Sequence, residues 1–242
     1  VGPNYVYVGG YNGKIYAYRP NGDFHGTFDT TSTQPIVGST LVALGNAYFG
    51  SSDGKVYALK ADTLQKIWQF PTEGNIGKIW STPVADSSTI YVTSFDKKLY
   101  ALNASTGSKK WDFTTGGALV ASPVLYKNTV YFGSIDRHVY AVNAQDGTLK
   151  WKSEVPAKGW FWTSVIINND VVYASSLDGK VYILNASNGK NTADAVSLDS
   201  GVSSQPVAVG NAVIVASEKG HVYAIDTTNY QKRELNSLEQ AI

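Results

Sequence analysis

The chain has 242 residues and a net charge of +1, so it does not have the charge of a general nucleic-acid or membrane-surface binder. It contains no Cys, which excludes disulfides and thiolate metal sites, and no run of 18 apolar residues that could span a membrane. Charged residues make up only 16%, and 23 Gly and 16 Tyr favour strands and tight turns. This composition favours an extracytoplasmic location, and Val at position 1 is expected of a processed chain or of a segment of a longer one.

One seven-residue pattern recurs along the whole chain. In chain order its copies are NGKIYAY (12–18), DGKVYAL (53–59), DKKLYAL (96–102), DRHVYAV (136–142), DGKVYIL (178–184) and KGHVYAI (219–225). Their shared tyrosines are Tyr16, Tyr57, Tyr100, Tyr140, Tyr182 and Tyr223, at intervals of 41, 43, 40, 42 and 41 residues. A period near 40 with strand-like content is typical of a propeller blade.

Each period predicts four strands, which we name A to D in chain order. Strand A is predicted at 81–85, 121–125, 163–167 and 204–208. Strand B follows, and an Asp-Gly or Asn-Gly hairpin leads to strand C, the repeated pattern itself. Strand C is apolar on both faces, as expected of a strand between two stacked sheets. A second turn leads to strand D.

These elements predict an all-β fold: a six-bladed β-propeller of four-stranded antiparallel blades in a single domain over residues 1–242. The first repeat begins at strand B (5–10) and has no strand A of its own. The final residues, Gln240-Ala241-Ile242, resemble Gln34-Pro35-Ile36 at the start of a strand A. We therefore expect the C-terminus to supply the missing strand, so that the two ends share blade one. The alternative is a segment of a propeller with seven or eight blades.

The segments DGKVYALKADTLQKIW, DKKLYALNASTGSKKW and DRHVYAVNAQDGTLKW resemble the repeat of pyrroloquinoline-quinone-type (PQQ-like) propellers. The resemblance implies that Trp68, Trp111 and Trp151, each eleven residues after the repeat Tyr, dock against a neighbouring blade. The same count places Thr27, Ala193 and Glu234 at this position in the other repeats. The family includes quinone-dependent dehydrogenases and non-catalytic scaffolds such as the barrel-assembly lipoprotein. The resemblance thus implies the fold and leaves the activity open.

Two sets of polar residues recur with the repeat. Carboxylates at the hairpins suggest either a calcium site or turn residues that bond their own backbone, and we favour the turn; they are Asp53, Asp96, Asp136 and Asp178. A base stands two residues before each repeat Tyr: Lys14, Lys55, Lys98, His138, Lys180 and His221. These bases are expected on one face, either as solvated strand ends or as a shallow site for an anionic ligand.

The strongest binding signal is aromatic. Two loops between strands D and A, residues 74–82 and 156–164, contain large rings beside lysines: Lys78, Trp80, Lys158, Trp160, Phe161 and Trp162. Exposed Trp next to Lys is typical of binding hot spots. The alternative is that these rings fill the mouth of a central channel as part of the core.

No nucleophile or phosphate-binding motif accompanies the repeats. The three His (His25, His138 and His221) are too scattered for a metal site. The sequence therefore favours a non-catalytic extracytoplasmic scaffold with a protein partner on the face formed by the D–A and B–C loops, without cofactor, metal, nucleic acid or membrane span. The alternatives are a quinone-dependent dehydrogenase with PQQ and Ca²⁺, and a carbohydrate-binding propeller that uses the Trp residues.

Overall fold

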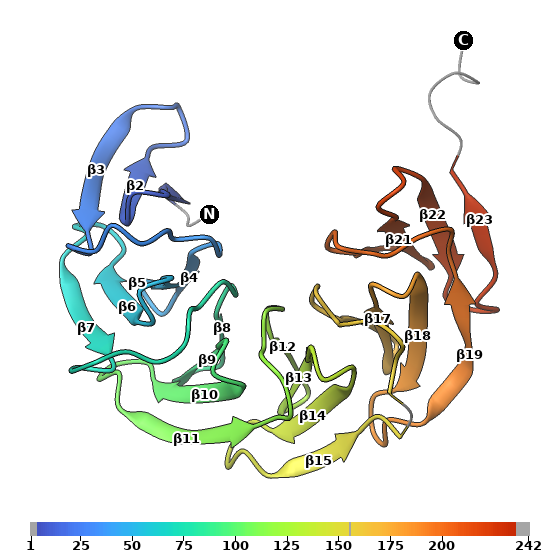
Figure 1. The fold of residues 1–242 in the computed structure, drawn as a ribbon. Helices are drawn as coiled ribbons and strands as arrows, with labels where there is room; N and C mark the ends of the chain where they lie inside the picture. The colour runs from blue at the N-terminus through green and yellow to red at the C-terminus, as the bar shows by residue number, and fades with distance from the viewer. Residues whose placement is uncertain (1–3, 155, 236–242) are drawn as a thin grey trace. The chain divides into compact units, whose positions relative to one another are not determined.

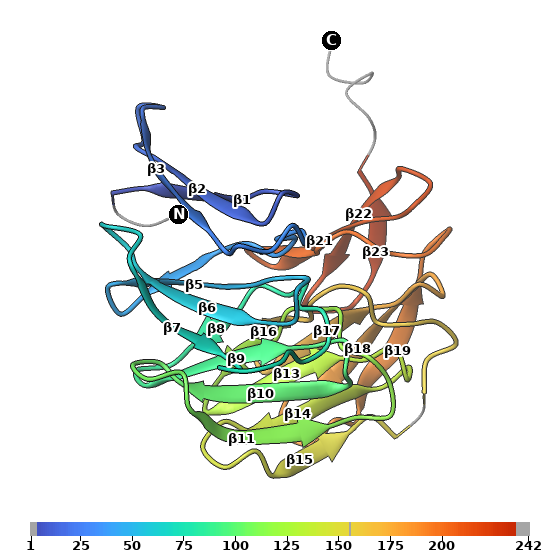
Figure 2. The same ribbon diagram turned by 60° about the vertical axis from the view of Figure 1, so that its left-hand side comes forward.

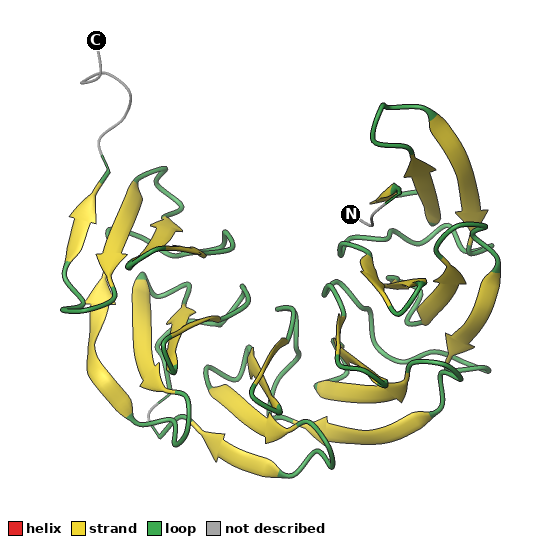
Figure 3. Cartoon of the chain, turned by 180° about the vertical axis from the view of Figure 1, so that it is seen from behind, coloured by secondary structure: helices red, strands yellow, loops and turns green. Residues whose placement is uncertain are grey.

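The structure, a computed structural model, describes residues 4–154 and 156–235, which form strands and loops without a helix (Figure 3). The 23 strands make six antiparallel sheets, one per repeat (Figure 1). Five sheets have four strands and the first has three described strands. This confirms the prediction of an all-β fold of six propeller blades, which we number one to six in chain order. By its contacts the chain divides into two compact units, residues 1–125 with 144–147 and residues 126–143 with 148–242.

The first unit contains blades one to three. Their sheet orders are β1-β2-β3, β4-β5-β6-β7 and β11-β10-β9-β8. The strands are β1 (Val6–Gly9), β2 (Lys14–Tyr18), β3 (Phe24–Asp29), β4 (Leu41–Ala43), β5 (Asn46–Gly50), β6 (Val56–Lys60), β7 (Lys66–Phe70), β8 (Val84–Ala85), β9 (Thr89–Thr93), β10 (Lys98–Asn103) and β11 (Lys109–Thr114).

Blade four begins with β12 (Val124–Tyr126), where the first unit ends. The remaining sheet orders are β12-β13-β14-β15, β16-β17-β18-β19 and β20-β21-β22-β23. Their other strands are β13 (Thr129–Gly133), β14 (Val139–Asn143), β15 (Leu149–Lys152), β16 (Ile166–Asn168), β17 (Val171–Ser175), β18 (Lys180–Asn185), β19 (Asn191–Ser197), β20 (Val207–Val209), β21 (Ala212–Ala216), β22 (Val222–Asp226) and β23 (Lys232–Glu234).

Strand C is buried on both faces, as its composition predicts. In β6, Val56, Tyr57, Ala58 and Leu59 are all buried. Their alternate side chains enter two different core clusters, one shared with blade one and one shared with blade three. Figure 2 shows β2, β6 and β10 as successive layers of the first unit. In the second unit, a cluster around Tyr173 similarly joins blades five and six.

Strand A is shorter than predicted. It begins at Val84, Val124, Ile166 and Val207, about three residues later than the sequence suggests. In blade two it begins at Leu41, so Gln34-Pro35-Ile36 belongs to the preceding loop and is not the start of strand A as predicted. Proline, which lacks a backbone N–H for a sheet ladder, stands directly before the strand in three of these blades. The residues before it link neighbouring blades instead: the Ser39 amide donates to Thr82 Oγ1 at 3.0 Å, and the Thr82 amide donates to Ser122 Oγ at 2.8 Å.

The predicted fourth strand of blade one, residues 240–242, lies outside the described residues. The ring closure that depends on it therefore stays a prediction, as does the single-domain organisation. Within the described residues, β1 pairs with β2 from Val6↔Tyr18 to Gly9↔Ile15 and is the edge strand of its sheet.

Candidate functional site

Tryptophan joins successive blades, as the resemblance implies. The indole N–H of Trp68, Trp111 and Trp151 donates to a carbonyl in the C–D turn of the next blade: Ala104 O at 3.0 Å, Ala144 O at 3.2 Å and Ala186 O at 2.8 Å. The same three carbonyls also accept a hydroxyl from strand B of the Trp-bearing blade, at 3.2, 2.9 and 3.0 Å; the donors are Tyr48, Tyr91 and Tyr131. Each docking contact thus fixes one blade against its successor.

Strand register corrects two of the three positions predicted to replace Trp. Each Trp pairs with the residue after the repeat Tyr, as in Ala58↔Trp68. In blade one Ala17 pairs with Gly26, and in blade six Ala224 pairs with Arg233, so these residues stand at the Trp position rather than Thr27 and Glu234. The C–D turn of blade one is one residue shorter, and blade six lacks the bulge that the other blades have in strand D. A fixed count from the Tyr is therefore one residue too long. Ala193 is placed as predicted.

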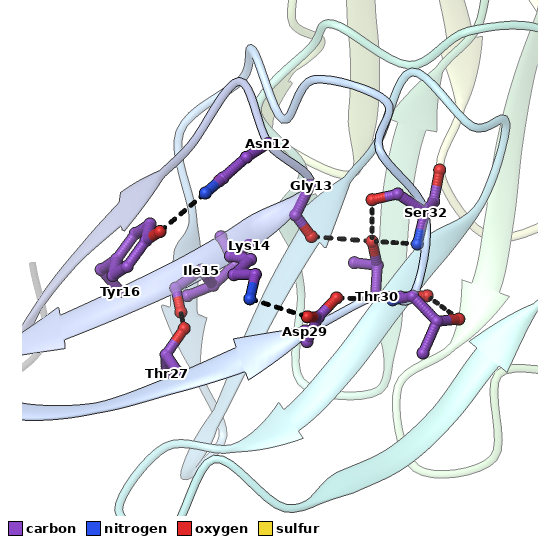
Figure 4. Close-up of polar contacts among 10 residues, drawn as sticks. Asn12, Gly13, Lys14, Ile15, Tyr16, Thr27, Asp29, Thr30 and Ser32 are labelled. Atoms are coloured by element: carbon purple, nitrogen blue, oxygen red, sulfur yellow. Dashed lines mark hydrogen bonds and ion pairs between the residues drawn. The ribbon is translucent and has the colours of Figure 1, made fainter.

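The hairpin carboxylates are turn residues, but they have a second partner that the sequence analysis missed. In blade two Asp53 Oδ1 accepts the Lys55 amide at 2.9 Å, and Oδ2 accepts the Tyr57 hydroxyl at 2.7 Å. Blades three, four and five repeat the Asp–Tyr bond at 2.6, 2.6 and 2.7 Å. The constant four-residue spacing of Asp and Tyr was a signal for it. In blade one the Asn12 amide donates to Tyr16 Oη at 2.8 Å (Figure 4).

Four of the six repeated bases have a polar partner, three of them within their own blade and His221 in the loop that follows strand D of blade five. In the first unit Lys14 pairs with Asp29 at 2.9 Å (Figure 4), and Lys98 pairs with Asp112 at 2.9 Å. In the second unit His138 Nδ1 lies 3.0 Å from the Ser153 carbonyl, and His221 Nδ1 lies 2.7 Å from Asp199 Oδ2. Lys55 and Lys180 are half-buried, and neither side chain has a partner within residues 4–154 and 156–235. Asp29 and Asp112 thus offset the charge of two of the four lysines that could attract an anion.

The loop of the second unit presents its aromatic residues unequally. Trp160 is 48% exposed and Lys158 is exposed, whereas Trp162 is half-buried. Phe161 is only 2% exposed, because its ring lies against Gly133 and edge-on to Tyr182 at 5.7 Å. Phe161 is therefore a packing residue, and the accessible part of the loop is Lys158, Trp160 and the outer part of Trp162.

Asp178 fastens this loop to the hairpin of blade five. Its Oδ2 accepts the Lys158 amide at 2.8 Å as well as the Tyr182 hydroxyl, and the Leu177 amide donates to the Trp160 carbonyl at 3.0 Å. Partial burial by itself raises the pKa of Asp178, but the hydrogen bonds from Tyr182 and the Lys158 amide outweigh it and leave the pKa below its ordinary value. A backbone held on both sides keeps Trp160 in place for contact.

The loop of the first unit is less accessible. Trp80 is half-buried, its indole N–H donates to Ser52 Oγ at 3.0 Å, and its ring meets Phe95 edge-on at 4.7 Å. Lys78 is exposed, and its carbonyl accepts the Phe95 amide. Trp80 thus serves local packing and leaves only part of its surface open to a ligand.

The described residues do not fit a calcium-bound quinone. No group of three or more His, Asp or Glu side chains that could hold a metal is found among them. Asp86 lies in the turn between β8 and β9. Its carboxylate accepts the Tyr91 hydroxyl at 2.6 Å and the amides of Ser88 and Thr89. These three hydrogen bonds make Asp86 a turn residue rather than a free carboxylate.

The chain has relatives among known proteins. A family model described as outer membrane protein assembly factor BamB matches residues 52–242. The chain belongs to this family. No curated protein matches it in sequence.

Solved structures share the fold of the BamB family member described here. The crystal structure of BamB from Moraxella catarrhalis is similar with a TM-score of 0.81 and 18% identity, over 97% of this chain and 71% of that one. The computationally designed Ika8 protein is similar with a TM-score of 0.86 and 16% identity, over 97% of this chain and 72% of that one. Identities this low support the propeller fold alone. The described residues also contain no helix long and apolar enough to cross a bilayer.

Proposed function

We propose that this BamB family member is a non-catalytic, protein-binding scaffold that acts outside the cytoplasm as a module of an envelope assembly. The family match supports the class of function, because the matching model is described as an outer membrane protein assembly factor. The observation that carries the proposal is the fastened loop at 156–164. It holds Trp160 at 48% exposure beside exposed Lys158. A rigid aromatic ring next to a cation is typical of the residues that dominate binding energy.

The remaining D–A and B–C loops contribute secondary contacts in this proposal. In the first unit, Lys78 and the exposed part of Trp80 contact the partner. Lys55 and Lys180 add positive charge at the starts of their strands. Lys14, Lys98, His138 and His221 already have polar partners and contribute less. The partner is thus expected to present an apolar patch with some acidic residues.

A site-specific photo-crosslinker tests this proposal in cells of the source organism. With p-benzoylphenylalanine at position 160, we expect one discrete protein adduct; at position 149 we expect none. Leu149 is the matched control, because it is 50% exposed and apolar but lies on β15 away from the loop. The adduct partner is then purified and titrated against the chain. Trp160→Ala should weaken its binding at least tenfold at unchanged melting temperature, whereas equal adducts at both positions would contradict the proposal.

Carbohydrate recognition remains the alternative, because an exposed indole also suits a sugar ring. A glycan array distinguishes the two functions. A saccharide that binds the wild-type chain and fails to bind Trp160→Ala would favour carbohydrate recognition over a protein partner.

A further inference from the structure

A second site lies in the second unit, between the last strand of blade four and the outer strands of blade five. It is a cavity of about 290 Å³ lined by Val139, Ser153, Phe161, Tyr182 and Leu184, with Glu154, Lys190 and Asn191 among its polar residues. Apolar cavities of about 150 Å³ are large enough for a benzene ring.

At the corresponding position the other blades have an apolar side chain. The position in question pairs with the residue before the repeat Tyr, as in Ile15↔Phe28, Val56↔Phe70, Leu99↔Phe113 and Val181↔Val196. In blade six the same place belongs to Leu235, whose amide donates to the Val222 carbonyl. Blade four alone has a polar residue there, Ser153, whose amide donates to the Val139 carbonyl.

In the first unit the phenyl ring at this position packs on the repeat Tyr of the next blade. Phe28 lies 6.0 Å from Tyr57, and Phe70 lies 5.7 Å from Tyr100, between ring centroids. Tyr57 and Tyr100 are buried as a result, whereas Tyr182 is only half-buried. The Ser153 hydroxyl does not fill the gap, because it accepts the Val139 amide at 3.1 Å. The missing group is therefore a phenyl ring beside Tyr182.

Phe161 forms a wall of the cavity and leaves it open. Its counterparts, whose amides donate to the equivalent carbonyls, are aliphatic: Ile36, Ile79, Leu119 and Val202. The larger ring of Phe161 turns its edge to Tyr182. The rings of Phe161 and Tyr182 surround the cavity together with Val139 and Leu184. Its rim has one exposed carboxylate, Glu154, and one exposed ammonium group, Lys190.

We propose that this cavity binds the side chain of a Phe residue from a partner protein segment, in the place that Phe28 and Phe70 occupy in their own blades. The charges on the rim favour a segment in which the Phe is flanked by one basic and one acidic residue. Lys190 and Glu154 can pair with these neighbours, since neither forms an ion pair among the described residues. The inference uses residues other than Trp160, so it does not depend on the loop surface.

The test uses the peptide Ac-Lys-Phe-Glu-NH2 titrated against the isotope-labelled chain by NMR. We expect saturable shifts of the amides of Val139, Tyr182 and Lys190, with at least tenfold weaker binding of Ac-Lys-Leu-Glu-NH2. Benzyl alcohol tests for a free small aromatic ligand, and it should bind at least tenfold more weakly than the peptide. Equal binding of the Leu peptide or of benzyl alcohol would overturn the proposal, as would the absence of saturable shifts.

Two variants locate the binding. Ser153→Phe supplies the missing ring from within, so it should raise the melting temperature and weaken peptide binding at least tenfold. Leu149→Phe adds a ring on the exposed face of the same strand and should leave the affinity within twofold. If Ser153→Phe proves destabilised, Ser153→Ala keeps the cavity open and should bind as the wild type does. Unchanged binding by folded Ser153→Phe, or lost binding by folded Ser153→Ala, would contradict the site.

Discussion

Trp68 is the residue at which packing and hydrogen bonding between blades coincide. It is 7% exposed, its indole N–H reaches the Ala104 carbonyl, and its ring lies against Gly107. Trp68→Ala removes this contact area and leaves a cavity, so we expect a loss of about 3–5 kcal/mol in the free energy of unfolding. Chemical denaturation measures this loss in the free energy of unfolding. Trp160→Ala is the matched control and should cost less than about 1 kcal/mol, because half of that ring is in solvent. Equal losses would show that the 156–164 loop is core.

Asp178 gives the stability of this region a predictable pH dependence. Its pKa in the folded chain lies below the ordinary value of about 4, so the ionised form is favoured by folding. The stabilisation is complete above pH of about 4 and is lost as the pH falls through the lower folded pKa. Asp178→Asn should therefore be less stable than the wild type near pH 7, and the difference should narrow below pH of about 4. Asp194→Asn, an exposed site on β19, should differ by less than about 0.5 kcal/mol at every pH. A constant gap for Asp178→Asn would contradict this role.

The residues that the sequence predicted best are those whose role repeats. The repeated pattern indicated the Asp turns, and the resemblance to PQQ-like repeats implied the Trp contacts. The burial of single residues was harder to predict. Phe161 and Trp160 are adjacent aromatics in the same loop, yet Phe161 is buried and Trp160 is about half exposed to solvent. The burial of a ring depends on the residue that lies opposite it. Gly133, which lies opposite Phe161, belongs to β13 of blade four. Nothing within the loop's own sequence distinguishes the two rings.

At the scale of elements, strand D of one blade and the C–D turn of the next complement each other in size. Where the strand has Trp, the turn has a Gly with positive φ directly against the indole: Gly107, Gly147 and Gly189. Where blade one has Gly26 instead of Trp, the turn of blade two has Leu64, with φ of 58° and its side chain towards Gly26. Where blade five has Ala193, the turn of blade six has Tyr230, with φ of 61° and its ring 6.5 Å from that of Tyr173.

A non-glycine residue in the left-handed region costs about 1–3 kcal/mol. Leu64 and Tyr230 are evidently retained because they fill space that an indole fills elsewhere. The sequence shows both members of each pair, but they lie about 38 residues apart. Their relation becomes visible only when the contact between strand and turn is known.

This complementarity predicts a favourable coupling in a double-mutant cycle. Gly107→Leu alone should be strongly destabilising, because a Cβ there would lie 2.6 Å from the Trp68 ring and φ is 72°. Trp68→Gly alone opens a cavity. Together they reproduce the Gly26–Leu64 pair, so the double variant should be at least about 1 kcal/mol more stable than the sum of the single losses. Trp68→Gly with Gly147→Leu is the control, since Gly147 lies on Trp111, and its losses should add within about 0.5 kcal/mol. Additive losses in the first pair would refute the complementarity.

At the scale of the whole molecule, the 41-residue period was enough to predict the fold class, the number of blades and the order of strands within them. Strand A was misjudged in length because its predicted bounds included the proline, which cannot donate in a sheet ladder, and the residues before it. The ends of the chain are the part that the repeat does not determine. A repeat unit carries the same information in every copy, whereas closure depends on residues that occur once.

The last prediction concerns the end of the chain. If residues 240–242 supply strand A of blade one, as the sequence predicts, they pair with β1, an edge strand within the described sheet that leaves Val8 48% exposed. An unpaired edge with apolar side chains invites association with another chain. Deleting residues 237–242 should then lower the melting temperature by several degrees and produce self-association in light scattering, whereas removing an unpaired tail does neither.

A point variant provides the control for chain length. Ile36, which Ile242 resembles in sequence, lies five residues before β4; it is 2% exposed and lies against Gly9 of blade one, so Ile242 should be buried if the C-terminus takes the same course. Ile242→Asp would place a charge in that position and should reproduce most of the effect of the deletion, while Glu239→Gln should be neutral. Unchanged melting temperature and a monomeric mass for both the deletion and Ile242→Asp would mean that the C-terminus does not complete blade one, and they would favour a segment of a larger propeller.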